Sequence, residues 1–400
     1  MIETHNATPS RTGGASMNLL DYLATKFDSF DDAPFNVLDS AVLSQFCMVR
    51  CEGLVPTARI EKASRISNVL ARTLPFGAKR SRFVDLLRAE HYASMFCGLS
   101  PESVKSNLLA LAASPRFRDL SIREYTSTFD EGRQTQFAAV CLVHERSFAY
   151  VGFRGTDTSI TGWRENFNMV ATSPVPAQQM ALSYLEAVAD RLPERLIVGG
   201  HSKGANLALY AALKASPAVQ KRIERVYALD GPGFKQGAVS DGEWEALEGR
   251  VHRSIPQQSI VGMLMNCPVE AHIAVSREHG LNQHSPFTWE VNDEANDFVH
   301  TDKLSDSARF FDEAMSSWLS LYSDEEAARI VDALFKAIEA SGTTNASEIF
   351  FGGLKTLPLI AKAAQNIDAE SRRVLTSAVM ALASTSGQTA TNLIKGARAE

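Results

Sequence analysis

The sequence predicts an α/β fold: a mostly parallel central sheet with flanking helices and helical additions at the N- and C-terminal ends. Three observations indicate this. Short apolar segments alternate with amphipathic ones over residues 119–300, the pattern of strand–helix–strand crossovers. Helical periodicity dominates before and after that stretch. One apolar segment also ends in Gly-x-Ser-x-Gly and leads directly into an amphipathic segment.

The composition indicates a folded protein and argues against nucleic acid as the main partner. Of the 400 residues 45 % are apolar, enough to offset the entropy of the chain. Lys and Arg number 40 and Asp and Glu 46, a net charge of −6, whereas binding to a nucleic acid duplex requires a basic face. We find no transmembrane segment, which needs about 18 apolar residues, and no secretory signal at the N-terminus.

The cysteines predict reduced thiols and not a disulfide framework or a metal site. Five are present, an odd number without any Cys-x-x-Cys pair, so we interpret them as small buried residues. Reduced thiols and the lack of a signal predict a cytoplasmic protein. The cysteines are Cys47, Cys51, Cys97, Cys141 and Cys267.

Before the sheet we expect a disordered tail and then helices. Residues 1–16 are polar and aperiodic, whereas residues 17–118 are mainly helical and are expected to pack on the core. The apolar positions within Leu19–Leu23 and within Val42–Phe46 each share a helical face. A further helix is predicted over Arg59–Leu74, because a proline and a glycine follow it.

We expect the α/β core over residues 119–300 and a C-terminal helical region over residues 301–400. A near-continuous apolar run within Thr135–Val143 suits a buried strand, and the polar turn after it predicts a hairpin. The predicted strands are Leu120–Phe129, Thr135–Val143, Phe148–Phe153, Arg195–Gly199, Arg225–Leu229, Val251–Ile255 and Glu270–Ser276, with helices over Gln179–Arg191 and Lys203–Ala215.

The strand–turn–helix around Ser202 predicts a nucleophile elbow. The turn reads Gly-His-Ser-Lys-Gly, and side chains at Gly200 or Gly204 would collide with the neighbouring strand and helix. The Ser202 hydroxyl would then stand at the carboxyl edge of the sheet. The N–H of Lys203, at the start of the helix, would face a developing oxyanion. The Lys203 side chain could attract anionic substrates, although the role of its backbone is the safer inference.

A second motif predicts the other half of an oxyanion hole. The predicted strand Phe148–Phe153 runs directly into the motif Phe-Arg-Gly-Thr. An acyl-transfer site needs a second N–H donor from a loop after an earlier strand. Thr156 can supply that N–H, and Gly155 allows a close approach. The alternative is an ordinary turn at the end of a strand.

These motifs, in this order, resemble class 3 lipases of the α/β-hydrolase superfamily and, more closely, the bacterial Mbeg1-like family (domain of unknown function 2974). The resemblance covers most of residues 17–380 and implies an α/β-hydrolase-like fold with a hydrolase-like site, but no particular substrate. One departure is Ala205, where family members commonly have glycine. The motifs are Asn18–Tyr22, Pro34–Asn36 with Asp39, Phe153–Thr156, Gly200–Gly204, Asp230–Phe234, Ser259–Gly262 and Gln283–His284.

A serine nucleophile needs an imidazole base, and five histidines follow Ser202. The resemblance favours His284, which precedes a Ser-Pro-Phe sequence, and His279 in the same predicted loop is the alternative. His252 and His272 lie in predicted strands and are interpreted as structural.

The acid that orients the base has two candidates. Asp230 ends a predicted strand, and Ser202, Asp230 and His284 follow the hydrolase order of nucleophile, acid and base. Class 3 lipases resemble this chain but carry an aspartate at the place where Ser259 stands, so Ser259 is a candidate acid substitute. Asp230 could instead simply form the turn that follows its strand.

Together these features predict a serine hydrolase of the lipase or esterase type. It would cleave a small-molecule or lipid acyl ester through an acyl-serine intermediate, without a metal or cofactor. The alternative is a weak or inactive relative that serves as a binding or assembly module. The segment Asp157–Gln178 would be a lid by resemblance or, equally, a packed connection. Peripheral contact with a membrane and the oligomeric state stay open.

Overall fold

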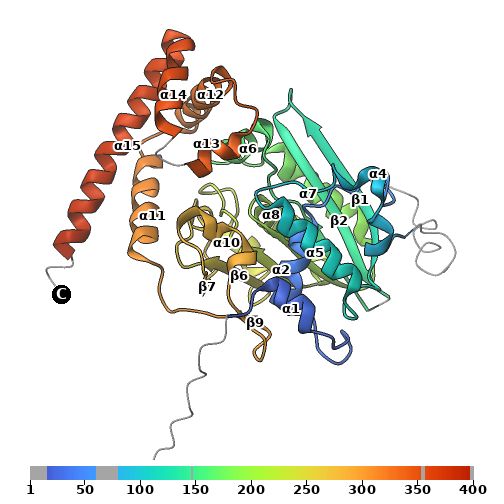
Figure 1. Cartoon of the computed structure of the whole chain (residues 1–400). Helices are drawn as coiled ribbons and strands as arrows, with labels where there is room; N and C mark the ends of the chain where they lie inside the picture. The colour runs from blue at the N-terminus through green and yellow to red at the C-terminus, as the bar shows by residue number, and fades with distance from the viewer. Residues whose placement is uncertain (1–15, 60–79, 146, 353–355, 397–400) are drawn as a thin grey trace, which may run out of the picture.

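The computed structural model describes residues 16–59, 80–145, 147–352 and 356–396 (Figure 1). The predicted tail over residues 1–16, apart from Ser16, and nearly all of the predicted helix Arg59–Leu74 therefore lie outside the described residues. The division of the chain at residues 118 and 300 stays a prediction.

The centre of the molecule is a seven-stranded sheet whose strands follow one another in chain order. The first three strands are antiparallel, and β3 to β7 are parallel. The predicted α/β class with a mostly parallel sheet is confirmed. The strands are β1 (Ser121–Asp130), β2 (Thr135–His144), β3 (Phe148–Phe153), β4 (Arg195–His201), β5 (Ile223–Leu229), β6 (Val251–Pro256) and β7 (Ala271–Ala274).

Side chains that alternate along the strands supply two cores, one on each face of the sheet. On β4, Ile197 faces the N-terminal helices, whereas Leu196 and Val198 face the helices that connect the parallel strands. The connecting helices are α7 (Pro176–Ala189) and α8 (Lys203–Lys214), with the short α9 (Pro217–Gln220) and α10 (Asp241–Glu245). Burial on both faces explains the continuous apolar runs within the central strands.

The N-terminal helices are held to one another by a buried charge cluster around Asp39. The Arg116 guanidinium donates to both carboxylate oxygens of Asp39, at 2.8 and 2.6 Å, and the Tyr22 hydroxyl donates at 2.8 Å. Asn36 caps the helix that carries Asp39. The helices here are α1 (Leu19–Thr25), α2 (Val37–Phe46), η1 (Phe83–Leu86), α4 (Ala89–Tyr92) and α5 (Pro101–Ala113). The motifs in this region thus have a structural explanation.

The C-terminal helices cover α6 (Ile160–Asn168), the helix that follows β3 (Figure 1). Phe350 stacks on Trp163 with ring centroids 4.6 Å apart, and Phe335 packs edge-on against Phe167 at 5.6 Å. The segment weighed as a lid or a packed connection is therefore a packed helix in this structure. The C-terminal helices are α11 (Asp306–Leu319), α12 (Asp324–Ala340), α13 (Ala346–Gly352), α14 (Leu357–Ala363), η6 (Ala364–Asn366) and α15 (Ala369–Gly396).

Between β7 and α11 the chain forms a loop region that lies beside the carboxyl ends of the strands. It contains η3 (Gly280–His284), η4 (Pro286–Thr288) and a two-stranded ribbon of β8 (Val291–Asn292) and β9 (Asp297–Phe298). The loop after β6 forms η2 (Val261–Met263). Within the described ranges, no helix combines the length and apolar character needed to cross a membrane.

Candidate active site

Ser202 occupies a strained turn between β4 and α8. Its φ of 60° and ψ of −130° lie in a region that residues other than glycine rarely adopt, and such strain is common at functional sites. A Cβ at Gly200 would lie 2.4 Å from the carbonyl carbon of Gly204, and one at Gly204 would lie 2.2 Å from the Phe153 oxygen. The turn therefore has the backbone geometry of a nucleophile elbow, and glycines are required on both sides.

His284 lies against Asp230 at the carboxyl edge of the sheet. Its Nδ1 is 2.6 Å from Asp230 Oδ2, and both side chains are buried. Trp289 Nε1 donates to the Gln283 carbonyl at 2.7 Å, and Gln283 Oε1 accepts from the Gln258 N–H at 2.9 Å, so this loop is fixed. A carboxylate on Nδ1 selects the tautomer that keeps Nε2 free to accept a proton.

Ser259 contacts the carboxylate and not the imidazole. Its hydroxyl donates to Asp230 Oδ1 at 2.5 Å, and the Gly262 N–H donates to the same oxygen at 3.1 Å. The group beside the His284 ring is therefore the Asp230 carboxyl group and not the Ser259 hydroxyl. His279 is exposed on the same loop, and His252 stacks on His272 with ring centroids 4.3 Å apart.

Of the two candidate oxyanion donors, Lys203 belongs to the elbow itself, and Thr156 lies on the loop after β3. A Cβ at Gly155 would be 3.6 Å from Ser202 Cβ and 3.0 Å from the His201 carbonyl oxygen, so the loop after β3 lies directly against the turn. The Thr156 hydroxyl accepts from Asn166 Nδ2 at 2.6 Å. In the part of the chain that the structure describes, neither the Thr156 nor the Lys203 N–H has an acceptor. Both are therefore candidate donors to an oxyanion.

The Lys203 side chain points into the core, away from the pocket. Its ammonium donates to the Glu165 carboxylate and, at 2.6 Å, to the Gln136 carbonyl, and both charged side chains are fully buried. Burial lowers the pKa of Lys203 against the opposing pull of Glu165. The idea that this side chain attracts anionic substrates is therefore wrong, because it is sealed from solvent.

We expect Glu165→Gln to lower the free energy of unfolding by about 3–5 kcal/mol, because it leaves the buried Lys203 charge without a partner. Adding Lys203→Met to that variant should recover part of the loss, because the unpaired charge is then gone. The new amide oxygen at position 165 can still accept a hydrogen bond from a backbone N–H that Glu165 binds. Urea denaturation of Glu165→Gln, Lys203→Met and the double variant measures this. Additive losses would contradict it.

His201 is a residue whose role in the site the motif did not reveal. Its Nε2 lies 2.6 Å from the His284 carbonyl oxygen, and the two rings are 4.5 Å apart. Burial, with a smaller effect of His284, holds the pKa of His201 well below its usual value, so the neutral ring donates through Nε2–H. His201 thus fixes the backbone of His284, although the two residues are 83 positions apart in the chain.

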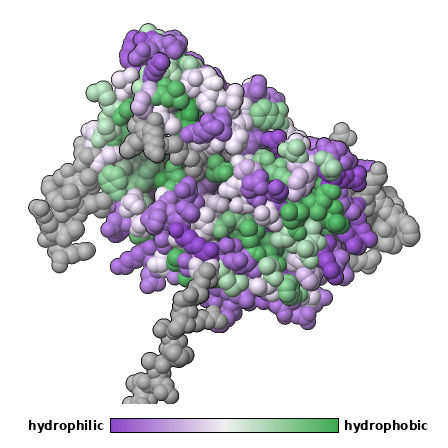
Figure 2. All heavy atoms as spheres, viewed as in Figure 1, coloured by the Kyte–Doolittle hydropathy of each residue, from purple (hydrophilic) through white to green (hydrophobic). Residues whose placement is uncertain are grey.

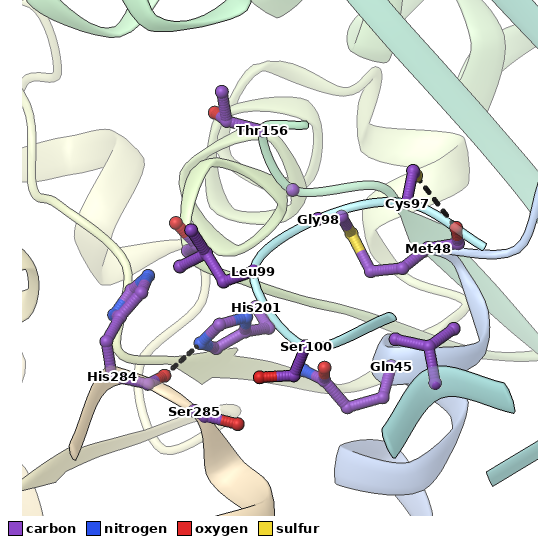
Figure 3. A pocket seen from close by; sticks show the side chains of 13 residues that line it. Gln45, Met48, Cys97, Gly98, Leu99, Ser100, Thr156, His201, His284 and Ser285 are labelled. Atoms are coloured by element: carbon purple, nitrogen blue, oxygen red, sulfur yellow. Dashed lines mark hydrogen bonds between the residues drawn. The ribbon is translucent and has the colours of Figure 1, made fainter. Parts of the chain in front are cut away.

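Arg154, in the Phe-Arg-Gly-Thr motif, joins the loop after β3 to the N-terminal helices. Its fully buried guanidinium donates to the Cys47 carbonyl at 2.8 Å, the Val49 carbonyl at 2.9 Å and the Tyr125 hydroxyl at 2.8 Å. This places the intervening Met48 beside the elbow. Ser202 and His284 line a pocket that also includes Met48. Figure 3 shows His284 and Met48 at this pocket.

The comparisons with known proteins give one family and a few distant structures. The Mbeg1-like family model matches residues 111–336, more than half of the chain. No curated protein matches the sequence. The Rhizomucor miehei lipase in its propeptide complex is similar at 19 % identity with a TM-score of 0.32, over 48 % of this chain and 64 % of that one. The M37 lipase is similar at 18 % identity with a TM-score of 0.32, over 41 % and 64 %.

The match covers 64 %, less than two thirds, of each of these two lipase structures. Within the described residues, no group of three or more His, Cys, Asp or Glu side chains is arranged to hold a metal ion. The family model covers more than half of the chain, and the match agrees with the order of the motifs. The protein therefore belongs to the Mbeg1-like family.

Proposed function

We propose that this protein is a serine hydrolase that cleaves a carboxylic ester through an acyl-enzyme on Ser202. The observation that carries the proposal is the 2.6 Å contact between His284 Nδ1 and Asp230 Oδ2 at the pocket that Ser202 also lines. A buried carboxylate is costly unless it is paired, and here its partner is an imidazole whose other nitrogen is available for catalysis.

In the proposed reaction the Ser202 oxygen attacks the ester carbonyl carbon while His284 Nε2 takes the hydroxyl proton. Asp230 stabilises the resulting imidazolium, and the N–H groups of Thr156 and Lys203 bind the oxyanion. The carbon–oxygen bond to the alcohol then breaks, and His284 returns the proton to the leaving alkoxide. Water attacks the acyl-serine by the same steps and releases the acid. The residues need no metal or cofactor for this chemistry.

A second candidate, a binding or assembly module that has lost activity, is favoured by one observation. Among the described residues, no hydrogen bond joins the Ser202 hydroxyl to the His284 ring. This contact is often long in the absence of substrate and shortens when substrate binds. Reactivity therefore distinguishes the two candidates, and geometry alone does not.

We expect a fluorophosphonate probe to label the folded protein once, at Ser202, because only an activated serine attacks phosphorus rapidly. Intact mass and peptide mapping measure the adduct. Ser202→Ala should abolish labelling, whereas Ser317→Ala, an exposed serine on α11, should leave it unchanged. A folded wild-type protein without an adduct would favour the binding module.

The compartment and substrate class belong to the same proposal. All five cysteines are free thiols, and four are buried, which supports a reducing, cytoplasmic compartment. A small-molecule or lipid acyl ester is the proposed substrate.

A further inference from the structure

The pocket beside Ser202 is closed by the N-terminal region, which lies mostly outside the part of the chain that the family model matches. Met48 follows α2, and a turn over Cys97–Ser100 precedes α5 (Figure 3). The Cys97 thiol donates to the Met48 carbonyl at 2.9 Å, and Arg154 holds the carbonyls on either side of Met48. Met48 and the turn Cys97–Ser100 thus form one wall of the pocket. This wall is anchored to the loop that carries the candidate oxyanion donor.

The wall leaves room for only a small group. A Cβ at Gly98 would lie 2.6 Å from Met48 Cε, and one at Gly155 would lie 3.6 Å from its Sδ, so the Met48 side chain fills the space between the two glycines. Leu99 and Val104 add apolar surface at the same pocket. The pocket, which is partly open to solvent, offers about 40 Å³, room for roughly three water molecules. An acyl chain of more than a few carbon atoms would have to extend out of it.

One polar group of the wall lacks a partner. Gln45 is only 5 % exposed and lines the same pocket, and its buried Nε2 finds no acceptor among the described residues. A buried amide donor without a partner is unfavourable, so such groups commonly pair with a ligand or water. A bound group with an acceptor oxygen would satisfy Gln45 on a side of the pocket where Ser100 and Cys97 are the other polar side chains.

We propose that Gln45, Met48 and Leu99 form the acyl subsite, and that it takes a short acyl group carrying a hydrogen-bond acceptor. The inference rests on the proposed ester hydrolysis and names its substrate class: an acyl group of about two to four carbon atoms with an ether, hydroxyl or carbonyl oxygen near its end. Met48 and Leu99 limit its length, and Gln45 donates to its oxygen.

Chain length is tested with the p-nitrophenyl esters of butyrate and octanoate. Wild-type kcat/KM for butyrate should exceed that for octanoate at least about tenfold, and Leu99→Ala should raise the octanoate-to-butyrate ratio by about tenfold. Leu109→Ala, an exposed leucine on α5 away from the pocket, is the matched control and should leave the ratio unchanged. A wild-type preference for octanoate, or a ratio that Leu99→Ala does not alter, would overturn the length limit.

The acceptor is tested with p-nitrophenyl methoxyacetate, in which an oxygen replaces one methylene of butyrate. The ratio of kcat/KM for methoxyacetate to that for butyrate should fall about tenfold in Gln45→Met, which keeps the length of the side chain but removes its donor. The intrinsic reactivities of the two esters cancel when the ratio is compared between proteins. An unchanged ratio in a variant with wild-type circular dichroism would overturn the role of Gln45.

Failure of this inference and failure of the proposed function give different results. Turnover that depends on Ser202, with unaltered ratios, would remove the subsite and leave the hydrolase. Absence of Ser202-dependent turnover for all three esters would overturn both. If Gln45→Met does not fold, Gln45→Leu serves as the second variant, and the wild-type length profile still decides on the length limit.

Discussion

His284→Gln is expected to lower kcat by about 10⁴- to 10⁶-fold, the loss typical of removing the base of a serine triad. Without an imidazole the Ser202 hydroxyl keeps its proton and is a weak nucleophile, while substrate binding is largely unaffected. Steady-state hydrolysis of a p-nitrophenyl ester of short acyl length measures the effect. KM should change much less than kcat.

The matched control for His284 is His279, five residues earlier in the same loop and exposed. His279→Gln should leave kcat within about twofold of wild type, because surface substitutions usually have small effects. A large loss in His279→Gln together with activity in His284→Gln would assign the base to His279. That result would contradict the geometry, in which His284 holds the contact to Asp230.

Asp230→Asn is expected to lower kcat by about 10⁴-fold, because an amide removes the charge that stabilises the imidazolium and allows the wrong histidine tautomer. Asn is close to isosteric with Asp, so the fold should be retained, which circular dichroism checks. Stopped-assay kinetics with high enzyme concentration make so large a loss measurable. The experiment tests whether a full charge on this strand is needed.

Ser259→Ala is the comparison that distinguishes the two acid candidates. Ser259 donates to Asp230 Oδ1, so its loss removes one hydrogen bond from the carboxylate and should cost only about tenfold in kcat. We therefore expect Asp230→Asn to lower kcat far more than Ser259→Ala. Equal losses would indicate that Ser259 and Asp230 act as one unit, and a larger loss in Ser259→Ala would reverse the assignment.

The C-terminal helices are joined to the site through α6. The inner side of this helix supplies Glu165 to the Lys203 ammonium and Asn166 to the Thr156 hydroxyl, and Arg164 on the same helix pairs with Glu339 of α12 at 3.2 Å. A helix that contacts both candidate oxyanion segments is thus covered by the C-terminal region. Figure 2 shows that the surface of this region carries both apolar and polar residues. The covering of α6 explains physically why the segment after β3 is packed in this structure, where a mobile lid was one alternative.

Local patterns in the sequence were sufficient for the strands and for the elbow. The apolar run in Thr135–Val143 predicted a strand because a strand buried on both faces has no polar side, and β2 is buried along nearly its whole length. The glycines around Ser202 predicted the turn because the collisions that they avoid come from residues within a few positions or on the adjacent strand.

Contacts between distant parts of the chain could not be predicted in the same way. No periodicity indicates that Gln45 and Met48 would line a pocket with Ser202 and His284, since these residues are far apart in the chain and belong to different elements. The direction of the Lys203 side chain could not be predicted for the same reason. Its position beside the nucleophile was evident, but its direction depends on Glu165, 38 positions away.

The sequence by itself determined the α/β class, the strands and the elbow with its required glycines, because these depend on the period of apolar residues and on local sterics. Only the tertiary structure decided that Asp230, and not Ser259, lies beside His284, and that the N-terminal region closes the pocket. The reason is that a hydrogen bond between side chains depends on the relative position of whole elements, which the packing of the two cores sets.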